Sequence, residues 1–288
     1  VAVLLGLVLA VVGALAAGFV REFFDQLQRY SRAYESNVPT YLRTHPVTTE
    51  RIADVENRLA QLPYRQTPDN LEFQLVRARL RTLSVAPREA VKLYDPAPAE
   101  KTPVALAAYA YGKALAFYRA SDLARAEETL APARKQSSAL IERLAAQIKL
   151  ERGNTAEGLS IYREAVKRFP DSRALSYGYA EALLTDRKSD VALKLINDRL
   201  QLTSGDPRLY ELQARCYAAL GQRFRQHRSQ AEAYAQRGQL GAAIEQLQLA
   251  LRARDGDFYD TSNAEARLKE LQGAFQAERK NQPNARAN

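Results

Sequence analysis

The sequence of 288 residues contains no methionine and no tryptophan, and it has one cysteine and two histidines. A single cysteine, Cys216, excludes a disulfide bond within the chain. Cys216 lies among small residues in a predicted helix, so we interpret it as a small buried side chain. A catalytic thiol would need a base such as His227 within reach, and no other feature supports one. Because methionine is missing even at position 1, we expect that the chain is not an intact translation product.

Histidine is too scarce for the usual helical zinc site. The two histidines, His45 and His227, lie far apart in the sequence, and the motif H-E-x-x-H does not occur. That motif places two histidine ligands on one face of a helix. We therefore predict no catalytic residue, no metal site and no cofactor for the chain itself.

Charge of one sign is not concentrated anywhere, although the net charge is +9. Dispersed basic residues are typical of solvated helix faces, and a positive balance favours acidic partners or anionic membrane surfaces. No basic stripe with interleaved aromatic residues stands out. We therefore expect no nucleic-acid partner.

A repeat is the most informative feature that is present. The turn positions Gly153, Arg187 and Gly221 are 34 residues apart, and similar units start at Ser121 and Gly238. An alanine precedes each turn by seven residues, at Ala114, Ala146, Ala180, Ala214 and Ala231. A small residue follows four of the turns by five residues, at Ala126, Gly158, Ala192 and Ala243, with Gln226 as the exception. Small residues allow two helices to cross closely, so the pattern resembles the tetratricopeptide repeat.

The repeat predicts an all-α fold, a tetratricopeptide-repeat solenoid made of helical hairpins. Helices are expected over 71–83, 87–94, 104–119, 123–134, 138–152, 155–169, 172–184, 190–202, 207–220, 224–237, 240–252 and 263–278. Gly221 and Gly238 are separated by only half a period. The helix 224–237 is therefore expected to close one unit and open the next, and the polar-faced last helix to cap the array.

The N-terminal 20 residues carry no charged side chain and are long enough to span a bilayer as a helix. An anchor, a secretory signal and a buried core helix are all open, and we favour a membrane-linked role. The predicted organisation is an apolar segment over 1–20, a short helical region over 21–66, a repeat array with its capping helix over 67–278, and a flexible tail over 279–288.

Several short stretches, in a fixed order, carry a resemblance to a known family. They are AGF at 17–19 with FFDQL at 23–27, LRTHPVT at 42–48 with RIAD at 51–54, FPDS at 169–172, DPRLY at 206–210, QHR at 226–228 with AEAY at 231–234, GQL at 238–240 with AIEQL at 243–247, and DGDFY at 255–259. Together they resemble the beta-barrel assembly-enhancing protease family of Gram-negative bacteria. Its members are periplasmic zinc metallopeptidases with a C-terminal tetratricopeptide domain.

The resemblance implies a periplasmic location, with membrane association through residues 1–20, and a role in outer-membrane protein quality control. Residues 21–66 would be a helical remnant of a metallopeptidase-like domain, inactive as the chain stands. His45 corresponds to a loop histidine that can occupy the family's zinc, so it would be regulatory only if a catalytic half were supplied elsewhere. The implied partners are protein or unfolded polypeptide, in particular outer-membrane β-barrel precursors or the machinery that assembles them.

The first helix of each unit is expected to line a concave peptide-binding groove. The candidate residues, counted from the recurring alanines, are Tyr111, Leu115, Tyr118, Arg143, Gln147, Tyr177, Glu181, Glu211, Arg215, Arg228 and Glu232. Tyrosine supplies contact area and arginine supplies forked donors, which suits extended or partly folded polypeptide. Each residue taken alone also fits an ordinary solvated helix face.

Two alternative functions stay open. The chain could be an incomplete copy of an active zinc metalloendopeptidase of the same family, or a membrane-tethered adaptor unrelated to barrel assembly. Zinc content with chelator-sensitive cleavage separates the first alternative from an interaction module, and crosslinking in cells separates the second.

Overall fold

The computed structural model describes residues 70–99 and 101–281. The chain divides into two units, residues 1–69 and residues 70–288. The predictions for residues 1–66, including the apolar segment, the peptidase-like remnant and His45, lie outside the described residues.

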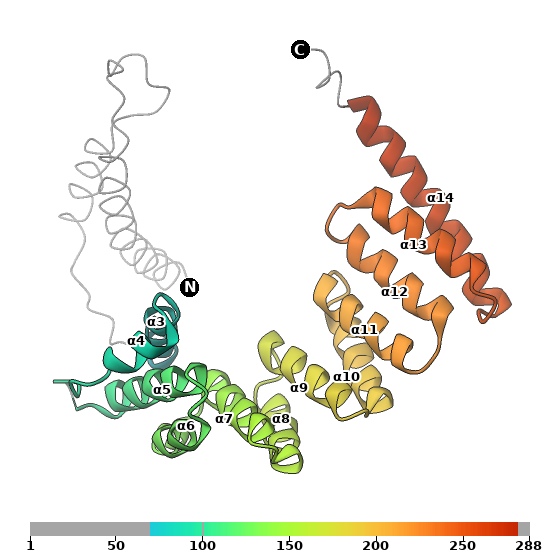
Figure 1. The fold of residues 1–288 in the computed structure, drawn as a ribbon. Coiled ribbons are helices and arrows are strands. Elements are labelled where there is room, and N and C mark those ends of the chain that lie inside the picture. The colour runs from blue at the N-terminus through green and yellow to red at the C-terminus, as the bar shows by residue number, and fades with distance from the viewer. Residues whose placement is uncertain (1–69, 100, 282–288) are drawn as a thin grey trace, which may run out of the picture. The chain divides into compact units, whose positions relative to one another are not determined.

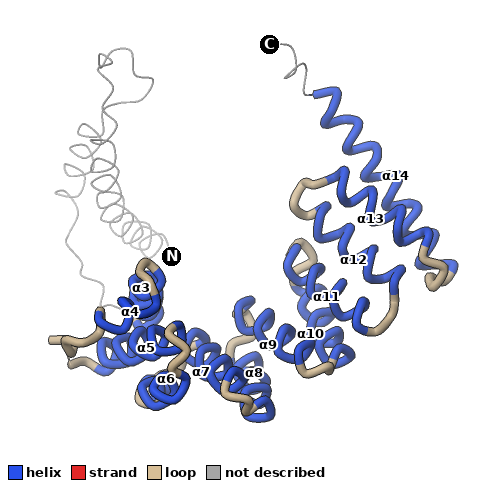
Figure 2. The backbone as a smooth tube through the Cα atoms, in the orientation of Figure 1, coloured by secondary structure: helices blue, strands red, loops and turns tan. Residues whose placement is uncertain are grey.

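The described part of the second unit contains helices and loops and no strand, which confirms the all-α prediction (Figures 1 and 2). Twelve α-helices follow one another along it. They are α3 (Leu71–Leu83), α4 (Pro87–Lys92), α5 (Pro103–Arg119), α6 (Leu123–Leu130), α7 (Ala139–Glu151), α8 (Thr155–Arg168), α9 (Arg173–Thr185), α10 (Ser189–Leu202), α11 (Pro207–Ala219), α12 (Arg223–Ala235), α13 (Leu240–Arg252) and α14 (Phe258–Asn281), with a short 3₁₀ turn η3 (Ala133–Lys135) after α6.

The helices stack as hairpins in chain order. Each helix from α3 to α13 contacts the helix that follows it, and α3, α5, α7, α9 and α11 also contact one another in succession. This second set of contacts joins the first helices of neighbouring units. It is the packing of a tetratricopeptide solenoid, in which each unit buries its apolar face against the next.

The five predicted turn positions are the five residues with a positive φ in the described chain: Ser121, Gly153, Arg187, Gly221 and Gly238. At each, the turn residue donates its N–H to the carbonyl three residues earlier, and the next residue donates to the carbonyl five residues earlier. This pair of bonds is the Schellman motif, which ends a helix through one left-handed residue. The common geometry explains why the repeat is visible in the sequence.

Small residues occupy the helix crossings, as predicted. All five recurring alanines are buried. A Cβ atom added at Gly158 of α8 would lie 2.7 Å from Leu150 Cγ and 3.1 Å from the Ala146 carbonyl oxygen of α7. A larger residue would therefore have to push the two helices apart.

α12 belongs to two hairpins, because its contacts with α11 and with α13 are the two most extensive helix–helix contacts in the described chain. Phe224 and Ala231 of α12 share a core cluster with Leu247 of α13 and Leu271 of α14. The half-period between Gly221 and Gly238 therefore has the predicted consequence.

Two helices have ends that differ from the prediction by more than two residues. α6 ends at Leu130 rather than at residue 134, because Pro132 lacks the N–H that would continue the helix. α14 begins at Phe258 rather than at residue 263 and continues to Asn281. Asp257 starts it by accepting the N–H of Asp260 at 2.7 Å, so this aspartate caps the helix instead of ending the loop.

The interpretation of Cys216 as a small buried side chain is confirmed. Cys216 is fully buried, as expected, and this burial raises the pKa of its thiol to about 11. Within residues 70–99 and 101–281, no helix has the length and apolar character that crossing a membrane requires.

Candidate functional site

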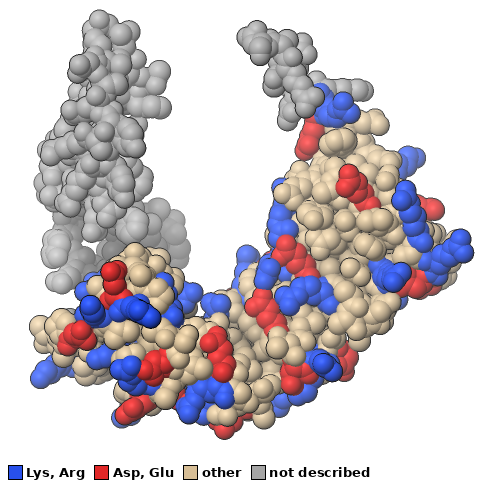
Figure 3. Space-filling view, in the orientation of Figure 1, with Lys and Arg blue, Asp and Glu red and all other residues tan. Residues whose placement is uncertain are grey.

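Six of the eleven predicted groove residues line one of three cavities, two are buried in the core, and Arg143, Glu211 and Arg215 line none of the three cavities. The cavities have volumes of about 350, 210 and 730 Å³. Figure 3 shows basic and acidic side chains interspersed over the described surface in this view. A ligand would therefore meet mixed charge rather than a field of one sign.

Tyr111 and Leu115 are a correction to the sequence prediction. Both are buried in the core, with exposed fractions of 0% and 4%. The reason is α3, which packs along α5 and contributes Leu75 to the same core cluster. Arg79 of α3 also donates to the Tyr111 hydroxyl at 3.4 Å. These two side chains are therefore part of the packing between the first two units.

The first cavity, of about 350 Å³, brings together predicted residues from three successive first helices. Tyr118 of α5, Gln147 of α7 and Glu181 of α9 all line it. Gly178 leaves room at its wall, since a Cβ atom there would lie 2.6 Å from the Tyr162 hydroxyl. These three side chains therefore share one cavity, and their role in binding stays a prediction.

Two phenols line this cavity beside the carboxylates of Glu151, Glu181 and Asp186. Burial raises the pKa of Tyr162 to about 12, although the neighbouring Arg143 charge acts in the opposite direction. Burial and a hydrogen bond to the Glu151 carboxylate both raise the pKa of Tyr118. Arg143 Nε is buried and has no hydrogen-bond partner in the described part of the chain. At neutral pH the two tyrosines are therefore hydroxyl donors beside an acidic rim.

The second cavity, of about 210 Å³, contains Tyr177 of α9. The Tyr177 hydroxyl donates to the Asp206 carboxylate. Burial, and to a smaller extent this hydrogen bond, raise the pKa of Tyr177 to about 12. Asp206 also accepts the N–H of Arg208 at 3.0 Å and so caps α11. Tyr177 is therefore tied to the start of the next helix.

Glu211 is part of a chain of ion pairs rather than a free groove residue. Arg208 bridges Glu181 and Glu211, and Arg237 reaches Glu211 at 2.6 Å. These contacts link α9, α11 and the turn after α12. The predicted residue Arg215 is exposed and lines none of the three cavities.

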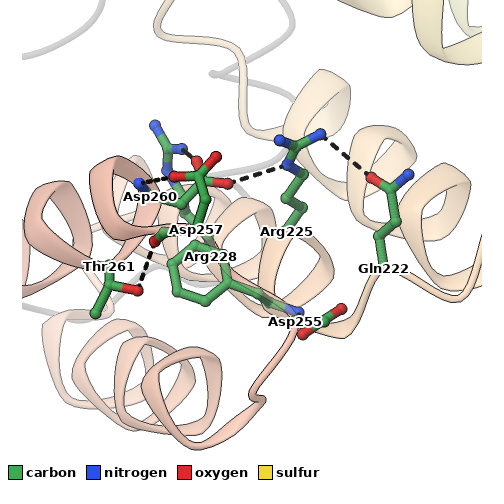
Figure 4. A network of polar contacts seen from close by, with 8 residues as sticks. Gln222, Arg225, Arg228, Asp255, Asp257, Asp260 and Thr261 are labelled. Atoms are coloured by element: carbon green, nitrogen blue, oxygen red, sulfur yellow. Dashed lines mark hydrogen bonds and ion pairs between the residues drawn. The ribbon is translucent and has the colours of Figure 1, made fainter.

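The third cavity, of about 730 Å³, contains the predicted residues Arg228 and Glu232 of α12. Glu232 is held by Arg267 of α14 through two bonds of 3.0 and 2.9 Å. Arg228 pairs with Asp260 at 3.2 Å, and Arg225 pairs with the same carboxylate at 3.2 Å (Figure 4). The remaining lining residues are Asn197, Leu200, Gln201, Tyr210, Gln213, Tyr217 and Ser229.

Sequence reasoning missed Arg225 and Asp260, although a partial signal existed. Arg225 lies three residues before Arg228 and therefore on the same helix face. Tyr210 and Tyr217, two turns apart on α11, give a comparable signal. His227 Nδ1 lies 2.9 Å from Gln246 Oε1 of α13, which is a contact between neighbouring helices.

Within the described stretches, no group of three or more His, Cys, Asp or Glu side chains is placed to hold a metal ion.

Comparison with known proteins confirms the expected resemblance. Residues 149–216 match the family model of the tetratricopeptide repeat. The protein named Beta-barrel assembly-enhancing protease of Yersinia pestis is 26% identical over 226 residues, which cover 77% of this chain and 46% of that protein. Its namesake in Escherichia coli strain K12 is 28% identical over 236 residues, which cover 81% of this chain and 47% of that protein.

The chain thus spans about half the length of the curated relatives it matches. A solved structure described as YrrB, a TPR protein with an unusual peptide-binding site, has a TM-score of 0.44 and 14% identity. The aligned region covers 62% of this chain and 93% of the YrrB chain. A likeness at this level adds nothing to the helical fold already described.

Proposed function

We propose that this chain is a periplasmic interaction module that holds unfolded or partly folded polypeptide, with outer-membrane β-barrel precursors or their assembly machinery as its partners. The proposal rests on one observation above the others. Tyr118, Gln147 and Glu181, from three successive first helices, line one cavity. The similarity to proteins named Beta-barrel assembly-enhancing protease supports the choice of partner and of compartment.

The chemistry of this cavity suits an unfolded barrel strand. Such a strand alternates apolar and polar side chains and has unpaired main-chain N–H and C=O groups. The phenols of Tyr118 and Tyr162 and the amide of Gln147 can bond to those groups, while the tyrosine rings and Leu150 cover apolar side chains. Binding of this kind depends on main-chain chemistry and therefore accepts many sequences.

Photocrosslinking from two equivalent repeat positions tests the proposal. Gln147 and Arg215 each follow the recurring alanine by one residue, but only Gln147 lines a cavity. A benzophenone amino acid is placed at either position of the full chain, and a denatured outer-membrane β-barrel protein is added by dilution. We expect strong adducts from position 147 and weak adducts from position 215. Equal labelling from both positions would contradict a site in this cavity.

The same material separates the two alternatives. Cleavage of the added barrel protein that a chelator stops, together with zinc bound to the purified chain, would favour the zinc endopeptidase. Crosslinking in cells that yields only proteins unrelated to barrel assembly would favour the membrane-tethered adaptor. Adducts with barrel precursors or their assembly machinery support the interaction module.

A further inference from the structure

Two arginines of α12 converge on a single carboxylate in the third cavity (Figure 4). Arg225 Nε lies 3.2 Å from Asp260 Oδ2, and Arg228 Nη1 lies 3.2 Å from Asp260 Oδ1. Each carboxylate oxygen is therefore met by one arginine. The only other hydrogen bond of these two guanidinium groups within the described chain runs from Arg225 Nη1 to Gln222 at 3.5 Å. Several arginine donors are left available to the cavity.

The arginines that contact Asp260 make fewer bonds each, and are more exposed, than the arginine of the ion pair beside it. Glu232 and Arg267 form a two-bond fork at 3.0 and 2.9 Å, with side chains that are 20% and 28% exposed. The side chains of Arg225 and Arg228 are 46% and 44% exposed, the Asp260 side chain is 15% exposed, and each arginine makes a single bond to Asp260. Ion pairs with this much solvent contribute little stability, and so the fork holds α14 in place more than Asp260 does.

The rest of the cavity is built from groups that recognise polypeptide. Its volume of about 730 Å³ lies in the range of ligand-binding pockets. Tyr210 and Tyr217 supply aromatic area from α11. Gln213 donates to Asn197 at 2.7 Å and accepts from Ser229 at 2.7 Å, which fixes the orientation of its amide. Fixed amides and hydroxyls beside aromatic rings suit an extended main chain.

We propose that Arg225 and Arg228 bind a carboxylate of a polypeptide ligand, and that Asp260 occupies this position as an internal stand-in which the ligand displaces. The carboxylate is that of a C-terminus or of an acidic side chain. The inference rests on the proposed polypeptide binding and adds a second site with a defined chemical preference. Two arginines spaced by one helical turn can receive both oxygens of one carboxylate, as they do with Asp260.

Asp260 can leave the arginines without unfolding α14. Its backbone N–H is held by Asp257 Oδ1 at 2.7 Å, and the Thr261 hydroxyl donates to the Asp257 carbonyl at 2.8 Å. Neither bond involves an arginine. A carboxylate in the first turn of a helix is also stabilised by the helix dipole when it turns toward solvent. Displacement therefore requires a side-chain rotation rather than a movement of the helix.

Fluorescence anisotropy with three labelled peptides of one neutral sequence tests the proposal on the full chain. The first peptide has a free C-terminal carboxylate, the second is amidated and contains one glutamate, and the third is amidated with glutamine in its place. The variants are Asp260→Asn and the double substitution Arg225→Gln with Arg228→Gln. The control, Arg215→Gln with Arg223→Gln, removes the same charge from exposed positions outside the cavity.

We expect the original chain to bind one or both acid peptides more tightly than the neutral peptide. The substitution Asp260→Asn removes the internal competitor and frees both arginines from partly exposed ion pairs. It should therefore tighten the binding of acid peptides about fivefold and leave the binding of the neutral peptide unchanged. The Arg225 and Arg228 double variant should lose the preference for acid, while the control keeps it. Whichever acid peptide gains more from Asp260→Asn identifies the source of the carboxylate.

Four results would overturn the inference. They are equal binding of all three peptides, no change on Asp260→Asn, the same loss in the control as in the double variant, and absence of binding to any peptide. If the double variant fails to fold, the inference is still tested by the binding of the three peptides to the original chain and to the Asp260→Asn variant. Adducts from position 147 combined with no carboxylate preference would reject this site alone and leave the proposed function standing.

Discussion

The regular region α7–α10 and the irregular region α11–α14 differ in how their cavities arise. In the regular region the turns at Gly153 and Arg187 repeat at a full period, and the cavity collects Gln147 and Glu181 from equivalent positions of α7 and α9. In the irregular region a half-period makes α12 shared, and α14 returns to pack on it through Arg267 and Asp260. Regular repeats thus display surfaces that the period predicts, while the interruption creates a polar cavity from residues that are distant in sequence.

The largest expected effect is a loss of stability at a helix crossing of the regular region, compared with the equivalent repeat position of the irregular region. Gly158→Val should destabilise the protein by about 2 kcal/mol, because a side chain there meets Leu150 and the Ala146 carbonyl within 3.1 Å. Gln226 holds the equivalent repeat position but is only half-buried, so Gln226→Ala should change stability by less than about 0.5 kcal/mol. Urea unfolding followed by circular dichroism measures both, and a comparable loss in the two variants would remove the distinction.

The same contrast explains how much the sequence could predict. The turns and the recurring alanines are local features, since one left-handed residue and one close crossing define each unit. Tyr111 and Leu115 were misplaced because α3, which has no equivalent turn, covers their helix face. The pairing of Arg225 and Arg228 with Asp260 could not be predicted, because it depends on the direction in which α14 leaves the loop after α13. Local repeats are therefore readable from one sequence, and contacts across their interruption are not.

The turn at Gly238, which ends the half-period, is expected to tolerate substitution as well as the regular turn at Gly153. Gly238 and Gly153 have φ values of 72° and 84°, and a Cβ atom added at either would meet no atom within 4 Å. Alanine at either position therefore encounters only the strain of a left-handed backbone, about 1 kcal/mol. Gly238→Ala and Gly153→Ala should lower the free energy of unfolding by the same amount. A clearly larger loss at Gly238, measured by urea unfolding, would show that the shared helix α12 needs a more exact turn.

The smallest expected effect concerns Glu127, a carboxylate next to the regular region that is 31% exposed, to be set against the Glu232–Arg267 fork of the irregular one. The pKa of Glu127 on α6 lies below its ordinary value because Lys149 donates to its carboxylate at 2.8 Å, and Arg152 adds a second contact. A lowered carboxyl pKa stabilises the folded state above the ordinary value of about 4.3. This contribution disappears as the pH falls through the lowered pKa.

Glu127→Gln should therefore lower the free energy of unfolding at pH 7 by about 0.5 kcal/mol, the usual size for an exposed ion pair. The difference should vanish in acid, where the original Glu127 is itself protonated. Urea unfolding across this pH range measures the effect, with Glu128→Gln as the control, since the neighbouring Glu128 is exposed and forms no ion pair within the described chain. Identical pH profiles for the two variants would show that the contacts with Lys149 and Arg152 add nothing. The Glu232–Arg267 fork would then be the stronger link between helices, and α14 the better-anchored element.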